Sequence, residues 1–136
     1  FNQRDWRTPA VRLSTLNTEK YPILIASHAC CGEFISEHYF SENSAKKIDF
    51  FKGIENNVNM TRLQQLSAVF YPAKLEKCIT QYKKIWLLTS ILFDNDAIRK
   101  IDENYLVYGE LFKGGIKIQF YDYGKMKSNY TVKLPR

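Results

Sequence analysis

The apolar positions over residues 73–92 recur at helical spacing. Leu75, Ile79, Tyr82 and Trp86 are separated by steps of three and four residues, and charged and amide side chains fill most of the positions between them. This spacing places the apolar side chains on one face of a helix. After Trp86 the apolar face widens, so we expect the end of this amphipathic helix to be buried more deeply than its start.

The last third of the chain alternates apolar and polar residues with a period of two. Residues 104–111 and 116–121 both alternate, and a Lys-Gly-Gly sequence at 113–115 separates them. Two alternating segments joined by a glycine pair predict a β-hairpin. Residues 129–134 alternate in the same way and predict one further strand. The polar face of each segment indicates an antiparallel sheet with one solvated side.

Earlier segments predict additional strands. Residues 23–26 form a short apolar run with β-branched residues, and residues 33–40 are rich in aromatic side chains. Residues 61–71 are compatible with a helix or with another element, because the segment with helical spacing is short and ends at Pro72. Shorter candidate strands are marked by Val11, Leu13 and Thr15, and by Ile48 and Phe50.

Together these elements predict one β-rich α+β domain over residues 1–136. About six or seven strands with one long helix, over about 73–92, indicate a strongly curved antiparallel sheet or a small β-barrel that the helix plugs or caps. Such a barrel has room for its own side chains or for one small ligand.

The composition favours binding over catalysis. Nine Tyr, nine Phe and two Trp supply large apolar areas with polar rims, which suits a pocket or an interface. The net charge of +6 favours an acidic partner, although a soluble domain with a basic surface has the same charge. The basic residues are scattered, and no base-stacking sheet motif accompanies them. We therefore predict no direct nucleic-acid contact and keep a nucleic-acid-binding module as an alternative.

The three cysteines leave two interpretations open. In an oxidising compartment, Cys30 or Cys31 forms a disulfide with Cys78, and the third cysteine stays unpaired. Otherwise all three are small buried residues. His28 lies close to the first two, but the spacing does not match a zinc loop and further ligands are missing. We therefore predict no metal and no other cofactor.

His28 and His38 are the only histidines, and an alternative enzymatic function would depend on one of them. Either of them, with nearby carboxylates and lysines, would serve the acid–base chemistry of a bacterial nuclease or toxin domain. Neither has a motif around it, so we expect no enzyme. A histidine also titrates near neutral pH. Because His38 shares a predicted strand face with Phe34 and Phe40, it is our candidate for a pH-responsive residue.

The segment 88–120 reads LTSILFDNDAIRKIDENYLVYGELFKGGIKIQF and resembles the C-terminal part of the ToxS family, the periplasmic partners of membrane-bound ToxR-type transcription regulators. In that family an Asp-containing link follows an apolar helix, and a basic pair, a strand, a glycine turn and a closing strand come next. Here these places are filled by RKI at 99–101, NYLV at 104–107, GG at 114–115 and IQF at 118–120. RDW at 4–6 is similar to the Arg-Glu-Trp that opens the periplasmic part of ToxS. The tail after Asp122 and the cysteines depart from the family pattern, which indicates a divergent member.

The resemblance implies the periplasmic domain of a bacterial inner-membrane protein, with a lipocalin-like barrel and an N-terminal anchor upstream of Phe1. It implies a heterodimer with the periplasmic domain of a ToxR-like regulator that controls virulence genes. It also implies a response to acidity or an amphipathic ligand such as a bile salt or a fatty acid. Cys31 is the candidate disulfide partner of Cys78. The expected ligand cavity is lined by Phe34, His38, Phe40, Phe50, Ile116, Ile118, Phe120 and Tyr130.

Overall fold

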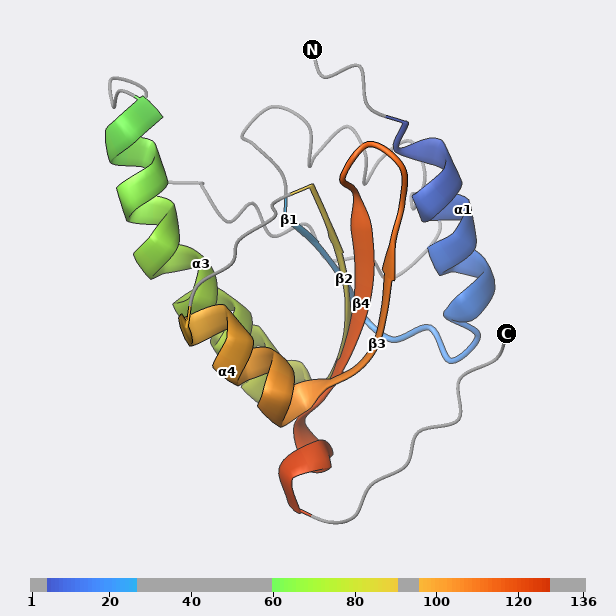
Figure 1. Cartoon of the computed structure of the whole chain (residues 1–136). Helices are drawn as coiled ribbons and strands as arrows, with labels where there is room; N and C mark the ends of the chain where they lie inside the picture. The colour runs from blue at the N-terminus through green and yellow to red at the C-terminus, as the bar shows by residue number, and fades with distance from the viewer. Residues whose placement is uncertain (1–4, 27–59, 91–95, 128–136) are drawn as a thin grey trace.

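The computed structural model describes residues 5–26, 60–90 and 96–127, and of residues 60–70 it describes the helical backbone alone. These residues form an α+β fold with a four-stranded mixed sheet and three α-helices. Figure 1 shows the sheet between α1 on one side and α3 with α4 on the other. The α+β class predicted from the sequence is confirmed.

The strand order within the described residues is β1-β2-β4-β3, and the sheet is open. Strand β1 (Ile23–Ala26) pairs in parallel with β2 (Lys84–Thr89). Strand β4 (Lys117–Asp122) is antiparallel to both β2 and β3 (Leu106–Leu111). The predicted strand at 23–26 is confirmed, but a purely antiparallel sheet was the wrong prediction. The reason is that α3 lies between β1 and β2 in the chain, and a helical crossover returns the next strand in parallel.

These four strands do not close into the predicted barrel. The expected strands at 33–40, around Ile48 and Phe50, and at 129–134 lie outside the described residues. The described sheet is therefore a mixed open sheet, and the lipocalin-like form stays a prediction.

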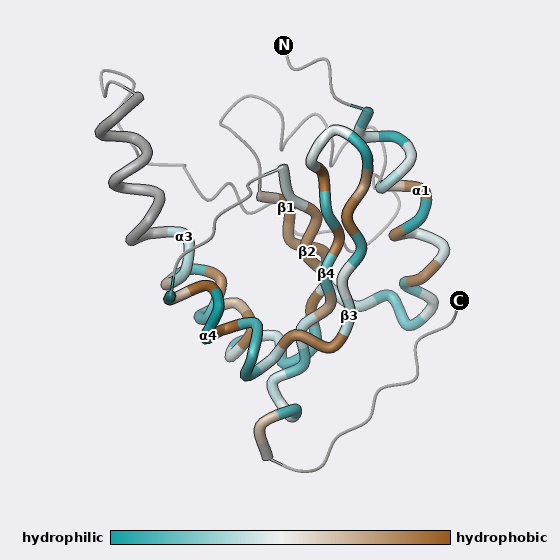
Figure 2. The backbone as a smooth tube through the Cα atoms, viewed as in Figure 1, coloured by the Kyte–Doolittle hydropathy of each residue, from teal (hydrophilic) through white to brown (hydrophobic). Residues whose placement is uncertain are grey.

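Both faces of the sheet are covered, so the predicted solvated face is wrong. Leu24, Leu87 and Tyr121 pack with α3 and α4 in one buried cluster. Ile25 and Trp86 pack with α1 in a second cluster on the opposite face. Figure 2 shows β1 and β2 as nearly continuous apolar runs, which is typical of strands buried on both faces.

The helix predicted over about 73–92 is wrong in its second half. Helix α3 (Met60–Tyr82) begins earlier and ends at Tyr82, and β2 follows after one residue. Lys83 has a φ of 69°, a left-handed conformation that ends the helix. The helical stripe up to Tyr82 was interpreted correctly, but the apolar run after it belongs to a strand buried on both faces. Over such a short run the two patterns look alike.

The alternation at Val11, Leu13 and Thr15 predicted a strand, and this is wrong. These residues lie in helix α1 (Arg7–Leu16). Leu13 and Leu16 are spaced three apart and face the sheet with Ala10. The carboxylate of Asp5 starts the helix by accepting hydrogen bonds from the backbone N–H groups of Arg7 (3.0 Å) and Thr8 (3.3 Å), and this capping competes successfully with local alternation.

The strand predicted over 104–111 is shorter than expected. Helix α4 (Asp96–Tyr105) occupies the preceding segment, and β3 begins at Leu106. Ile98, Ile101 and Tyr105 are buried at helical spacing and pack on α3 and the sheet. Helix α4 is followed directly by the β-hairpin, whose turn was predicted correctly. Gly114 and Gly115 have φ values of 95° and 86°, which favour glycine.

Candidate functional site

The predicted ligand cavity is only partly within the described residues. Ile116, Ile118 and Phe120 lie in the cluster beneath α1, together with Leu13 and Trp86. All three are buried and belong to the packed core between α1 and the sheet. The other predicted cavity residues lie outside the described residues: Phe34, His38, Phe40, Phe50 and Tyr130. The cavity as a whole therefore stays a prediction.

The cysteine and histidine predictions fall mainly outside the described residues. Cys78 is a buried free thiol on α3, and burial raises its pKa. Cys31, its candidate partner, lies outside the described residues, as do His28 and His38. Within the described residues no three potential metal ligands come together. No helix in the same residues is long and apolar enough to span a membrane.

Strand β3 forms one edge of the sheet within the described residues. The backbone N–H of Phe112 donates to Ile116 O (2.7 Å), so Phe112 bonds inward to the β4 side of the hairpin. Inward and outward backbone groups alternate along an antiparallel strand. Gly109 and Leu111 therefore direct their N–H and C=O groups away from β4. The Leu111 side chain is 68% exposed, which leaves an apolar group beside an open backbone edge.

The start of β3 is less accessible than its end. The register shifts between Leu106 and Tyr108, which indicates a bulge. The ammonium group of Lys125 donates to Leu106 O at 2.7 Å. Bulges and lysines are devices that block the pairing of edge strands. The regular and open part of this edge is therefore Tyr108 to Leu111.

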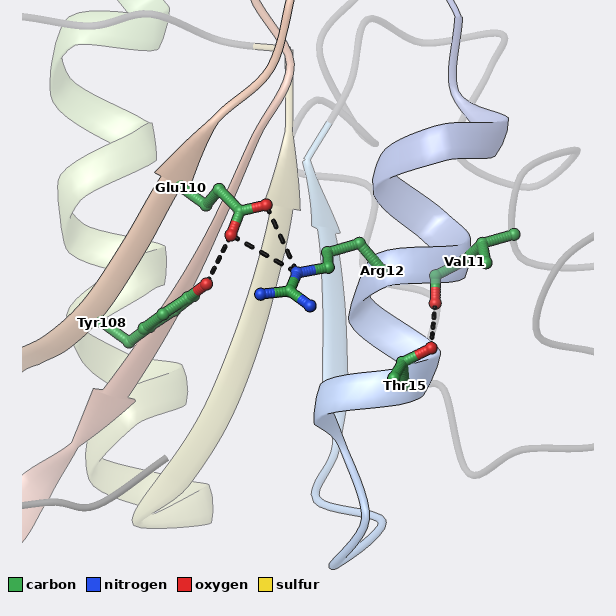
Figure 3. Close-up of polar contacts among 5 residues, drawn as sticks. All are labelled: Val11, Arg12, Thr15, Tyr108 and Glu110. Atoms are coloured by element: carbon green, nitrogen blue, oxygen red, sulfur yellow. Dashed lines mark hydrogen bonds and ion pairs between the residues drawn. The ribbon is translucent and has the colours of Figure 1, made fainter. Parts of the chain in front are cut away.

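A polar bridge joins this edge to α1, and Figure 3 shows it. Arg12 Nε lies 3.4 Å from Glu110 Oε1, and the Tyr108 hydroxyl donates to Glu110 Oε2. Val11 and Thr15 point away from this bridge, and the Thr15 hydroxyl donates to Val11 O at 3.0 Å. The bridge fixes α1 next to the β3 edge through Arg12.

The outer side of α1 carries a shallow hollow of about 260 Å³. It is lined by Ala10, Val11, Ser14 and Thr15, and Val11 is 54% exposed. Together with Leu111 at the end of β3, Val11 is one of three exposed large hydrophobic residues among those described. The Arg12–Glu110 bridge therefore joins two elements, β3 with its open end and α1 with a small hollow of mixed polarity on its outer side.

A second group of polar residues lies on the opposite face of the sheet, under α3 and α4. The Tyr121 hydroxyl donates to Asp102 Oδ1 on α4 at 2.8 Å, and Gln119 Oε1 lies 3.1 Å from the same hydroxyl. The hydroxyls of Tyr71 on α3 and Thr89 on β2 share a hydrogen bond. Three layers of the fold thus contribute polar groups to one region of the interior.

Burial perturbs the ionisable groups of this region. It raises the pKa of the Asp102 carboxyl, and the hydrogen bond from Tyr121 and the charge of Lys117 act in the opposite direction. It lowers the pKa of the Lys117 ammonium, which the charge of Asp102 opposes. The pKa values of Tyr71 and Tyr121 are raised, chiefly by burial. Clusters of perturbed groups of this kind are common at functional sites.

Sequence reasoning missed this polar group. Lys117 and Gln119 were interpreted as the solvated face of a strand because they alternate with apolar residues. Asp102 belongs to α4, a helix that the sequence analysis did not predict. The spacing of Ile98, Ile101 and Tyr105 was the signal that would have revealed this helix.

No protein-family model, no curated protein and no solved structure matches this chain.

Proposed function

We propose that this chain is a non-enzymatic accessory and sensor domain that binds the periplasmic domain of a ToxR-like transcription regulator. In this proposal it acts in the periplasm, is held at the inner membrane by an anchor upstream of Phe1, and stabilises a regulator of virulence genes. The observation that carries the proposal is the open end of β3, where Gly109 and Leu111 turn their backbone groups outward.

The partner adds a strand to this edge. Strand addition uses main-chain hydrogen bonds for affinity and neighbouring apolar groups for specificity. The exposed side chain of Leu111 supplies an apolar contact next to this edge, and the exposed side chain of Val11 supplies a second one on α1. The added strand continues the sheet from β3, and with the predicted strands outside the described residues it completes a lipocalin-like enclosure.

An amphipathic anion, such as a bile salt or a fatty acid, is the proposed signal. Its apolar body would contact the aromatic face that includes Phe120 and Ile118. Because α1 covers this face, the ligand gains access only when α1 moves away. Occupancy of the sheet face and the position of α1 beside the β3 edge are therefore coupled in this proposal.

The interface is tested by changing Leu111 to proline. Proline removes the outward N–H of residue 111 and leaves the inward bonds of β3 to β4 in place. We expect Leu111→Pro to weaken binding of the regulator's periplasmic domain about tenfold or more, because it removes one hydrogen bond and places the proline ring in the path of the added strand. Affinity is measured by calorimetry after co-expression has identified the partner.

Leu111→Ala is the matched control. It removes the same side chain but keeps the N–H, so we expect it to retain most of the affinity. Circular dichroism establishes that both variants are folded. If Leu111→Pro binds the regulator as tightly as the unaltered chain does, the β3 edge is not the interface and this proposal is wrong.

A further inference from the structure

Three residues of β4 place polar side chains on the face covered by α3 and α4. Lys117, Gln119 and Tyr121 are two residues apart, and successive side chains of a strand point to opposite faces. Tyr121 packs in the cluster that contains α3 and α4, so Lys117 and Gln119 share that face with it. Gln119 is buried and Lys117 is half-buried at the start of the strand.

Lys117, at one end of this polar face, lies at the carboxyl ends of the two parallel strands. Ala26 and Thr89 are the last residues of β1 and β2 and are paired with each other. Thr89 is in turn paired with Lys117 on β4. In open sheets with parallel strands, ligands bind outside the carboxyl ends of those strands. Lys117 therefore occupies the edge where such a ligand would arrive.

The charge of Lys117 is not matched by a close partner. Within the described residues its ammonium group makes no ion pair and no hydrogen bond, and Asp102 acts on it only through a longer-range attraction. One oxygen of Asp102 is already occupied by the Tyr121 hydroxyl at 2.8 Å. Within the described residues, Lys117 Nζ is not one of the buried polar atoms that lack a hydrogen bond, so the ammonium group keeps contact with solvent and is accessible to an anion.

We propose that Lys117 is the anchor of a binding site for a small oxyanion, a carboxylate or a phosphate group, at the carboxyl ends of β1 and β2. The amide of Gln119 lies beside it on the same strand face. Asp102 on α4 opposes the ligand, because its negative charge competes for the ammonium group and repels the anion. The site lies on the opposite side of the sheet from α1. Lys117 is paired in register with Leu111, so the site borders the proposed regulator interface at the end of β3.

The test is calorimetric titration of the whole chain with inorganic phosphate and, separately, with acetate at constant ionic strength. We expect saturable binding of at least one anion. The anion with the higher affinity indicates whether the natural ligand presents a phosphate or a carboxylate group. Lys117→Met keeps the length of the side chain but not its charge, and we expect it to weaken binding tenfold or more. Lys113→Met is the control, because Lys113 is exposed in the hairpin turn and removing it changes the net charge by the same amount.

Asp102→Asn separates a binding role from a structural one. Asparagine still accepts the hydrogen bond from Tyr121 but carries no charge, so we expect anion binding to become several-fold tighter. A purely structural role of Asp102 would leave the affinity unchanged. In the unaltered chain, the bound anion should also slow acetylation of Lys117 relative to Lys113, as followed by peptide mass spectrometry.

Two results would overturn the proposal. One is the absence of saturable binding of both anions together with unchanged acetylation of Lys117. The other is equal binding by the unaltered chain and Lys117→Met. Both results are obtained without the regulator and without a change at Leu111, so failure of this proposal is distinguishable from failure of the proposed β3 interface.

Discussion

At the scale of single residues, Trp86 shows how neighbours fix a side chain at the centre of the sheet. It is 1% exposed, and its ring centroid lies 4.8 Å from that of Phe120 and 6.0 Å from that of Tyr108. Its indole N–H has no hydrogen-bond acceptor within the described residues. A buried donor without an acceptor costs about 1–3 kcal/mol. Trp86 therefore stabilises the fold by packing and not through its polar group.

We predict that substitutions at Trp86 separate the stabilisation by ring packing from the cost of the unsatisfied indole N–H. Trp86→Ala should lower the free energy of unfolding by about 3–5 kcal/mol, because it leaves a large cavity. Trp86→Phe should cost less than about 2 kcal/mol, since it keeps an aromatic ring and removes the unsatisfied donor. Guanidinium chloride unfolding measures both. Equal losses for the two variants would contradict the packing role of the aromatic ring.

At the scale of elements, the start of α1 depends on a carboxylate. Asp5 Oδ2 accepts a hydrogen bond from the Thr8 hydroxyl at 2.7 Å, and Asp5 Oδ1 accepts the N–H groups of Arg7 and Thr8. These bonds, that from the Thr8 side chain most of all, lower the pKa of Asp5 below its ordinary value of 3.8. A carboxyl whose pKa is lower in the folded state stabilises the fold in its ionised form.

The sign of the pH dependence follows from this shift. The contribution of Asp5 is fully present above pH 3.8 and is lost as the pH falls through its lower folded-state pKa. We predict that Asp5→Ala is less stable than the unaltered chain at pH 6 and that the difference shrinks towards pH 2. Thermal unfolding at a series of pH values measures this. Asp5→Asn should keep part of the cap but not the pH dependence, and a constant difference for Asp5→Ala would contradict the capping role.

The elements also show where periodicity is decisive. The stripe through Leu75 and Ile79 predicted part of α3, and the glycine pair at 114–115 predicted the hairpin turn. Periodicity failed for α1, where three alternating residues suggested a strand. It also failed at β2, where the apolar run suggested a continued helix. Both failures occur in segments of ten residues or fewer, where the two periods overlap and only burial separates them.

At the scale of the whole molecule, the sheet separates two hydrophobic clusters. Leu75 of α3 belongs to the cluster on one face, and Leu13 of α1 belongs to the cluster on the other. Both side chains are fully buried. Because the two clusters share the sheet but not side chains, each layer of helices should contribute its stability largely independently.

A double-mutant cycle tests this independence. We predict that Leu13→Ala and Leu75→Ala each lower the free energy of unfolding by about 2–5 kcal/mol. The double variant should lose the sum to within about 0.5 kcal/mol, as expected for distant sites without shared partners. Denaturant unfolding provides all three values. A large coupling energy would show that the sheet transmits packing changes from one face to the other.

The candidate sites follow the same division between sequence and tertiary structure. The sequence analysis marked Ile116, Ile118 and Phe120 as cavity residues because of their apolar alternation, and they lie in the core beneath α1. Asp102 was not selected, because helix α4 was not predicted. Lys117 was not selected, because a polar residue in an alternating strand normally faces water. The covering helices α3 and α4 change that environment, and no local pattern in β4 records their presence.

The sequence alone determined the α+β class, the hairpin, the short strand at 23–26 and a helical face before Tyr82. These features depend on local conformational preferences and on spacing within one segment. Only the tertiary structure decided that β1 and β2 run in parallel, that both sheet faces are covered, and that Lys117 lies near Asp102. These features depend on contacts between segments far apart in the chain, and the free energy of burying two faces outweighs the local preference of either segment.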